Sequence, residues 1–234
     1  MRDYDRPNTP RTREFGRLVV STNTDAAAPP PGTHKLELDE AGEALFHVPA
    51  RRQTDAPAPL LVMLHGAGGT AEHSLSVLRV PTDEAGVLLL APSSRDSTWD
   101  LLTGGWGHDV ALIERALDEV LGRYDVDRLR VGIGGFSDGA SYALSLGYTN
   151  GDLFSHILAF SPGFMAPAVM EDRPACFISH GTDDRVLPVD RCSRRLVPAL
   201  RAAGYEVRYD EFEGGHEVPR PIVADALDWF LARD

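Results

Sequence analysis

The pentapeptide Gly-Phe-Ser-Asp-Gly at positions 135–139 follows directly on the apolar run Leu129–Gly134. That run is typical of a short buried strand, and Ser141–Leu146 beyond it is typical of a helix. A serine on so sharp a strand-to-helix turn has a strained backbone and an exposed hydroxyl. Flanking glycines let the neighbouring segments pass closely without a Cβ clash. The stretch therefore predicts a nucleophile elbow with Ser137 at its tip.

Outward from this turn, apolar runs alternate with helical patterns. Strands are expected at 60–64, 87–90, 129–134, 157–160, 176–179 and 207–212, and helices at 71–78, 110–121, 140–148, 191–202 and 222–231. Continuous apolar runs bounded by Gly and Pro indicate strands buried on both faces, as in a parallel sheet. Asp109 is a candidate cap for the second helix, and Pro219 and Pro221 suit the opening of the last.

The N-terminal part of the chain has a different character. Residues 1–31 are polar and proline-rich, with one possible short strand at Arg17–Ser21, and we expect a flexible tail there. Lys35–Leu38 and Ala44–Val48 flank a turn and predict a β-hairpin. Residues 32–234 are expected to form one domain, a three-layer α/β sandwich with a mostly parallel sheet behind this antiparallel hairpin.

Composition narrows the classes of function and location. A formal charge of −12 argues against nucleic acid or an anionic membrane as the main partner. No apolar run has the length of a membrane span, and no secretory signal is visible, so a cytoplasmic location is expected. The two cysteines, Cys176 and Cys192, have no metal-site spacing and are expected to be reduced, although the fold could bring them together.

Three strand ends supply the groups that a nucleophilic serine needs. His216 follows the strand 207–212 within Glu-Gly-Gly-His-Glu, and it is the candidate general base. The acid lies in His-Gly-Thr-Asp-Asp-Arg-Val-Leu-Pro at 180–188, where two adjacent carboxylates cannot both face one imidazole. The glycine turn and the returning apolar residues favour Asp184 over Asp183, which is interpreted as a solvated or turn-capping carboxylate.

The glycine-rich turn His-Gly-Ala-Gly-Gly at 65–69 follows the strand 60–64. Such a turn can present backbone N–H groups to an oxyanion, with Ala67 as one donor and Asp138 as the other. A phosphate-binding loop is the alternative, but the turn has no GK[ST] and no Walker spacing. His65 is expected to hold the turn in shape rather than to act as a base.

The four stretches LHGAGG, GGFSDGA, HGTDDRVLP and GGHEVP stand in the order found in one family. The chain resembles the phospholipase/carboxylesterase group of α/β-hydrolases, which includes acyl-protein thioesterases and dienelactone-hydrolase-like esterases, over residues 34 to 234. The resemblance implies Ser137 as nucleophile, Asp184 as orienting acid and His216 as base, with no metal or organic cofactor. Asp138 stands where the thioesterases often have glutamine, which argues against a specifically thioesterase activity.

The loops suggest how a substrate would be held. Residues 161–174 are too few for a helical cap domain, so we expect an open site. Phe164, Met165 and Met170 are candidates for an apolar rim, with packing beneath the loop as the alternative. Trp106 in the long loop 92–108 is a pocket candidate, with core packing as its alternative.

The expected function is hydrolysis of small carboxylic esters with short-to-medium acyl chains through an acyl-enzyme on Ser137. A lysophospholipase or acyl thioesterase is the alternative within the same chemistry, and peptidase activity is disfavoured. A catalytically silent ligand-binding protein of the same fold is the alternative from another class. The sequence does not identify the physiological substrate or the oligomeric state.

Overall fold

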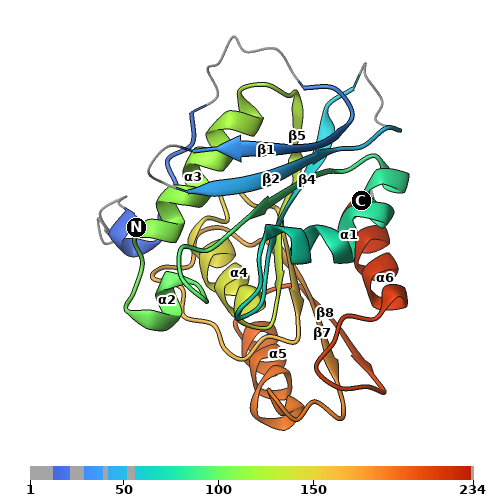
Figure 1. Ribbon diagram of the computed structural model, residues 1–234. Coiled ribbons are helices and arrows are strands. Elements are labelled where there is room, and N and C mark those ends of the chain that lie inside the picture. The colour runs from blue at the N-terminus through green and yellow to red at the C-terminus, as the bar shows by residue number, and fades with distance from the viewer. Residues whose placement is uncertain (1–12, 22–28, 39–41, 52–55, 233–234) are drawn as a thin grey trace, which may run out of the picture.

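The computed structural model describes residues 13–21, 29–38, 42–51 and 56–232 (Figure 1). Within these residues, eight strands form one sheet: β1 Gly32–Glu37, β2 Glu43–Val48, β3 Ala58–Leu64, β4 Leu88–Pro92, β5 Val126–Phe136, β6 His156–Phe160, β7 Ala175–Gly181 and β8 Val207–Phe212. The helices are α1 Ala71–Ala85, α2 Asp100–Thr103, α3 His108–Leu121, α4 Asp138–Thr149, α5 Ser193–Ala202 and α6 Arg220–Leu231, with 3₁₀ turns η1 Arg13–Phe15 and η3 Val189–Arg191. The expected hairpin and every expected strand after it are confirmed.

The sheet has the order β1-β2-β4-β3-β5-β6-β7-β8. β1 pairs antiparallel with β2, and β2 antiparallel with β4, whereas all the other neighbours are parallel. The parallel strands therefore end at one common edge, and the loops that leave their carboxyl ends converge there. Ligand sites in open α/β sheets lie at that edge, beside the point where the strand order reverses.

Helices cover both faces of the sheet, as Figure 1 shows, with α1 and α6 side by side on one face and α3, α4 and α5 on the other. The strand β3 shows why its sequence is apolar throughout. Leu60, Val62 and Leu64 pack into the core beneath α3 and α4, whereas Leu61 and Met63 pack beneath α1 and α6. Successive side chains point to opposite faces, so a strand covered on both sides has no polar face.

The first described segment, residues 13–21, is packed against the domain. Asn150 binds it from both directions, donating from Nδ2 to the Gly16 carbonyl at 2.7 Å and accepting the Leu18 N–H at 2.9 Å. The buried Arg17 guanidinium reaches Asp152 at 2.8 Å. The strand expected at Arg17–Ser21 is not formed, because the backbone N–H groups of these residues bond to side chains of α3 and of the loop after α4 instead of to a neighbouring strand.

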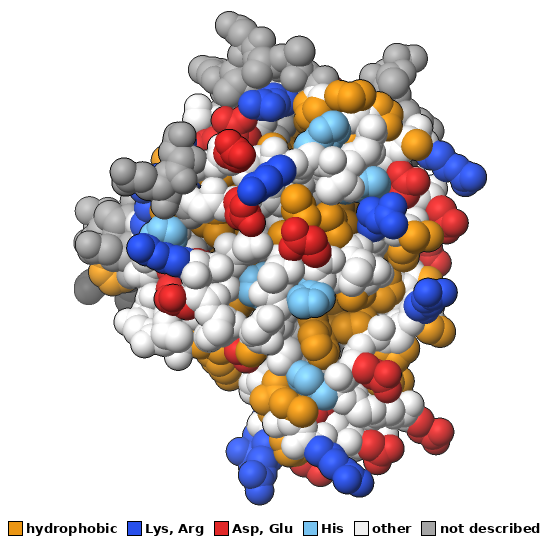
Figure 2. Space-filling model, viewed as in Figure 1, with side chains coloured by type: hydrophobic (Ala, Val, Ile, Leu, Met, Phe, Trp, Pro, Cys, Tyr) orange, Lys and Arg blue, Asp and Glu red, His pale blue; other side chains and the backbone are white. Residues whose placement is uncertain are grey.

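The remainder of the expected tail is described only at residues 29–31, and residues 1–12 and 22–28 lie outside the described residues. The division into a tail and one domain therefore stays a prediction. No helix among the described residues is long and apolar enough to cross a membrane. On the face seen in Figure 2, acidic and basic side chains are interspersed rather than gathered into one patch.

Two local expectations need correction. Helix α1 was expected over 71–78 but continues through Pro81 to Ala85, and its Thr82 hydroxyl bonds back to the Leu78 carbonyl at 2.8 Å. Asp109 does not cap α3, because the helix already begins at His108 and its N-cap residue is Gly107. The Asp109 carboxylate instead accepts backbone N–H groups of the preceding loop.

Candidate active site

Ser137 lies on the turn between β5 and α4, with φ 57° and ψ −118°. A non-glycine residue in this region is strained, and such strain persists only where the surroundings enforce it. The Ser137 N–H donates to the Phe160 carbonyl of β6 at 3.0 Å, which fixes the turn against the neighbouring strand. The elbow expected from the sequence is thus present as a backbone conformation, but Ser137 is buried, with 8% exposure, rather than exposed.

Glycines on either side make this turn possible. A Cβ on Gly135 would lie 2.3 Å from the Gly139 backbone, and a Cβ on Gly139 would lie 2.4 Å from the backbone oxygens of Leu64 and His65. Real Cβ atoms do not approach other atoms so closely. The two glycines therefore let the first turn of α4 pack directly on β5 and on the end of β3.

The structure brings together the serine, histidine and aspartate expected from the sequence. His216 Nε2 lies 2.8 Å from Ser137 Oγ, and His216 Nδ1 lies 2.6 Å from Asp184 Oδ2. The imidazole also packs on Phe136, with a ring-centroid distance of 4.7 Å. One chain of hydrogen bonds therefore connects the carboxyl ends of β5, β7 and β8.

Asp184 and Asp183 have different surroundings. The Asp184 side chain is fully buried, and its Oδ1 accepts the N–H groups of Val186 at 2.9 Å and Leu187 at 2.8 Å. Asp183 is exposed, and its N–H donates to the Gly214 carbonyl. The fold thus directs Asp184, and not Asp183, at His216.

The charge on Asp184 is stabilised despite its burial. Burial alone would raise the pKa of the Asp184 carboxyl, but the hydrogen bond from His216 and the N–H groups of Leu187 and Val186 outweigh it. The pKa of Asp184 is held below its ordinary value as a result. A carboxylate in this state can orient an imidazole and stabilise a positive charge on it.

The glycine-rich turn after β3 is held by His65. Its Nδ1 lies 2.8 Å from the Gly66 carbonyl, and its Nε2 accepts the Ser94 N–H at 3.0 Å, so the proton is on Nδ1. Burial lowers the pKa of His65 and favours this neutral form. His65 thus bridges the turn and the loop after β4, as expected of a residue that holds the turn in shape.

The two expected oxyanion donors belong to the turn after β3 and to the start of α4. Ala67 is exposed at the tip of the turn, and Asp138 follows Ser137 as the first residue of α4. Within the described part of the chain, neither backbone N–H donates to a protein acceptor. Both N–H groups therefore remain available to an external acceptor.

The loop after β4 contributes contacts that the sequence did not predict. Thr98 Oγ1 donates to Asp138 Oδ2 at 2.7 Å, and the Trp99 indole N–H donates to the His65 carbonyl at 2.9 Å. Asp109 and Asp100 bond reciprocally to one another's N–H groups at 2.8 Å and close the base of the loop. Burial raises the pKa of Asp109, against the effect of the N–H groups that it accepts. No motif in the sequence signals these long-range pairs.

Trp106, the pocket candidate, packs between Tyr142 of α4 and the N-terminal segment. Its ring lies 5.3 Å from the Tyr142 ring, and a Cβ on Gly16 would lie 2.8 Å from its indole. These contacts join the N-terminal segment to the fully buried Tyr142 of α4. They favour the packing alternative for Trp106, and its pocket role stays a prediction.

Phe164 and Met165 lie on the segment between β6 and β7, where no described residue is helical. Phe164 is 38% exposed, whereas Met165 is partly buried against the core. Ser141 Oγ, which the sequence did not single out, accepts the Gly163 N–H at 3.0 Å and fixes this segment to α4. Val186, two residues after Asp184, is a further exposed apolar residue of this region, with 66% exposure.

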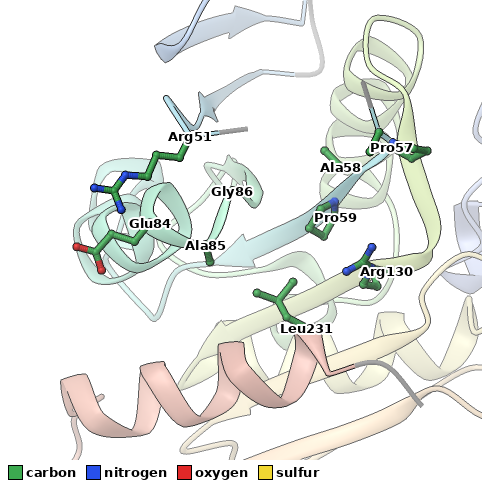
Figure 3. Close-up of a pocket in the computed structure, with 10 residues that line it drawn as sticks. Arg51, Pro57, Ala58, Pro59, Glu84, Ala85, Gly86, Arg130 and Leu231 are labelled. Atoms are coloured by element: carbon green, nitrogen blue, oxygen red, sulfur yellow. The ribbon is translucent and has the colours of Figure 1, made fainter. Parts of the chain in front are cut away.

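The two cysteines are free thiols. Burial raises the pKa of the Cys176 thiol to about 12, so it is not a nucleophile at neutral pH. A cavity of about 480 Å³ lies between Arg51, Glu84, Arg130 and Leu231 (Figure 3). Because it adjoins the beginning of β3, it is at the edge of the sheet opposite Ser137 and takes no part in this site.

Comparison with known proteins identifies the family. The phospholipase/carboxylesterase family model matches residues 110–232, just over half of the chain. The chain belongs to the phospholipase/carboxylesterase family. The matched region includes Ser137, Asp184 and His216, and it confirms the family expected from the sequence motifs.

A relative in sequence is feruloyl esterase B of Thermothelomyces thermophilus, which is 32% identical over 111 residues. The match covers 44% of this chain and 38% of the relative, so the chain spans well under half of that protein's length. Shared sequence thus covers only part of each protein.

Similar solved structures share the fold over most of the chain. They include the fluorophosphonate-binding serine hydrolase F of Staphylococcus aureus (TM-score 0.69, 15% identity, covering 87% of this chain and 100% of that one) and a ferulic acid esterase of Anaeromyces mucronatus (TM-score 0.67, 18% identity, 90% and 96%). A thermostable esterase has TM-score 0.67 and 22% identity over 85% of this chain and 61% of that one. The chain thus has the α/β-hydrolase fold.

Proposed function

We propose that this protein is a serine carboxylesterase in which Ser137 is the nucleophile, His216 the general base and Asp184 the acid that orients it. The observation that carries the proposal is the continuous hydrogen-bonded chain from Ser137 Oγ through His216 to Asp184 Oδ2, built on a strained elbow. Membership of the phospholipase/carboxylesterase family supports the same chemistry.

In the first half-reaction, Ser137 Oγ attacks the ester carbonyl while His216 Nε2 takes the hydroxyl proton. Asp184, ionised and bonded to His216 Nδ1, stabilises the imidazolium that forms. The tetrahedral intermediate then collapses, the bond to the leaving alcohol breaks, and His216 returns the proton to that alcohol. The product left on the protein is an acyl ester of Ser137.

In the second half-reaction, water takes the place of the alcohol. His216 removes a proton from the water as it attacks the acyl carbonyl, and then gives a proton back to Ser137 Oγ. The acid product leaves and the resting hydrogen bonds re-form. No redox partner or additional proton donor is required by these steps.

The backbone N–H groups of Ala67 and Asp138 are the proposed oxyanion donors. They belong to the two segments that meet at the elbow, the turn after β3 and the start of α4. Donors fixed in advance at such a point stabilise the developing charge without reorganisation, and one donor contributes about 10²- to 10³-fold in rate in well-studied cases.

Small esters with short-to-medium acyl or aryl groups are the proposed substrates. The segment between β6 and β7 has no helix among its described residues, so this segment supplies no helical cap over the serine. Phe164 and Val186 offer partly exposed apolar side chains for an acyl or aryl group. The names of two similar proteins, feruloyl esterase B and a ferulic acid esterase, favour including aryl esters in the test.

The experiment is a series of p-nitrophenyl esters from acetate to palmitate, together with an aryl ester such as methyl ferulate. We expect turnover of the shorter and aryl esters, with Ser137→Ala as the inactive but folded control. A maximum at the longest chains would favour the lysophospholipase alternative. Saturable binding of esters without turnover would instead support a ligand-binding protein.

A further inference from the structure

A second histidine, His180 at the end of β7, lies behind the acid. Its side chain is fully buried, and its Nδ1 lies 2.7 Å from Ser193 Oγ. Its Nε2 lies 2.7 Å from the Leu187 carbonyl and 3.3 Å from Asp184 Oδ2. Both polar atoms of His180 thus have partners in the loop of the acid and in the helix that follows it.

These partners fix the tautomer of His180. Nε2 faces a carbonyl and a carboxylate, both of which only accept hydrogen bonds, so Nε2 carries the proton. Burial lowers the pKa of His180 and favours the neutral imidazole. In that form Nδ1 is a bare acceptor, the Ser193 hydroxyl donates to it, and the ring is held at both ends.

Leu187 transmits this constraint to the acid. Its carbonyl accepts from His180 Nε2, while its N–H donates to Asp184 Oδ1 at 2.8 Å. Rotation of the Asp184 carboxylate would break the contacts of Oδ1 with Leu187 and Val186 and turn Oδ2 away from His216. Leu187, which holds Asp184 Oδ1, is therefore itself held by His180.

We propose that His180 is a positioning residue of the site: with Ser193 behind it, it holds Leu187 and Asp184 so that Asp184 Oδ2 faces His216. The inference rests on the proposed function for its effect on rate, but its geometric part concerns only the Asp184–His216 hydrogen bond. His180 acts through Asp184 and has no contact with the reacting atoms.

The charged surroundings are consistent with a neutral His180. Asp184 and His216 face it from the acid and base loops, and Glu211 faces it from β8, where Arg194 already binds that carboxylate at 2.6 Å. Cys192 lies near Asp184 on the α5 side, with a thiol pKa raised chiefly by burial. Burial lowers the pKa of His180 and is the largest influence on it. A protonated His180 would instead compete with His216 for the charge of Asp184.

The test compares His180→Phe, His180→Gln and Ser193→Ala. Phenylalanine keeps much of the ring volume but has no polar atom, whereas glutamine can place an N–H donor near the Leu187 carbonyl. We expect His180→Phe to lower kcat about 10- to 100-fold with KM nearly unchanged, since misplacement of a catalytic group by about 1 Å has effects of this order. His180→Gln should recover part of that loss, and Ser193→Ala should lose less.

His47 provides the matched control. It is a buried histidine on β2 whose Nδ1 lies 3.0 Å from the Thr33 hydroxyl and whose Nε2 lies 3.3 Å from Asp83 Oδ1, remote from Ser137. His47→Phe removes a similar pair of contacts and should leave kcat within about twofold. A loss of rate in His180→Phe no greater than in His47→Phe would overturn the inference.

A readout independent of turnover is the low-field proton resonance of the His216 Nδ1–H that bonds to Asp184. We expect this signal in the wild type, weakened or lost in His180→Phe and kept in His47→Phe. Its persistence in a folded His180→Phe would contradict the inference even if activity fell. If the signal is lost in His180→Phe but the wild type hydrolyses no ester, the inference stands and the proposed function is rejected. If His180→Phe does not fold, the same comparison is made between Ser193→Ala and Thr33→Val.

Discussion

His216 Nε2 lies 2.8 Å from Ser137 Oγ, although 79 positions separate the two residues in the chain. Ser137 follows β5 and His216 follows β8, and β6 and β7 lie between these strands in the sheet. The loop after β8 therefore reaches back across the carboxyl ends of two strands. A Cβ on Gly181 would lie 2.2 Å from the Gly215 carbonyl oxygen, so the glycine lets that loop pack on the loop of the acid, where the Asp183 N–H donates to the Gly214 carbonyl at 2.9 Å.

The two adjacent aspartates provide a matched pair of substitutions. Asp184→Asn removes the charge beside His216. It also puts an NH₂ donor where one carboxylate oxygen accepted a hydrogen bond, so kcat should fall about 10³- to 10⁴-fold. Asp183→Asn changes an exposed side chain and should leave kcat within a few-fold. Steady-state kinetics on one p-nitrophenyl ester measure both. The reverse ranking would exchange the proposed roles.

The elbow glycines should be sensitive to a single methyl group. Gly135→Ala places a Cβ 2.3 Å from the Gly139 backbone, so the first turn of α4 must move. We expect a loss of about 3 kcal/mol in the free energy of unfolding and of most esterase activity. Gly104→Ala is the control, since its Cβ would meet no atom within 4 Å. Urea unfolding of both variants makes the comparison, and equal stabilities would contradict this account of the turn.

Trp106→Ala distinguishes packing from substrate binding. The indole contacts Tyr142 and the N-terminal segment, and its partial burial leads us to expect a loss of about 1 to 3 kcal/mol in stability. The preferred acyl length should change little if packing is its role. A shifted chain-length profile at unchanged stability would instead establish Trp106 as part of the pocket.

Stability should depend on pH through the buried histidines. Burial lowers the pKa of His180 in the folded protein, whereas an unfolded histidine titrates near 6.5. Below about pH 6.5 the unfolded chain therefore binds a proton that the folded protein does not, and the free energy of unfolding falls as the pH falls. His180→Gln lacks this group.

The measurement compares urea unfolding of the wild type and His180→Gln at about pH 7.5 and about pH 5.5. We expect the wild type to lose more of its free energy of unfolding than the variant on acidification, because only the wild type buries a His180 whose pKa is lowered. His65 has a pKa shift in the same direction, but it is present in both proteins and cancels. Equal losses would show that His180 is not buried as a neutral group.

Much of the fold could be predicted because its signals are local. The apolar run Leu60–Leu64 indicates a strand covered on both faces, and the structure packs its side chains alternately against both layers of helices. The prediction of a strand at Arg17–Ser21 was wrong. Its apolar residues have a strand-like pattern, but its backbone N–H groups bond to the side chains of Asn150, Glu114 and Asp118.

The residues of the site could also be predicted in part, whereas some of their contacts could not. Ser137, Asp184 and His216 each stand beside a glycine-containing turn at a strand end, so their types and order were visible in the sequence. The contacts of Thr98 with Asp138 and of Ser193 with His180 join segments that no local pattern relates. Long-range pairs of this kind depend on the packed structure, and sequence spacing alone does not predict them.

Covalent labelling shows whether Ser137 is an activated nucleophile. The protein would be treated with a fluorophosphonate, digested and mapped by mass spectrometry, with ester hydrolysis followed in parallel. We predict one adduct, on Ser137, that accumulates as turnover disappears and is absent in Ser137→Ala and greatly slowed in His216→Ala. Ester turnover that survives in Ser137→Ala, or an adduct on another residue that accounts for the lost activity, would contradict the account.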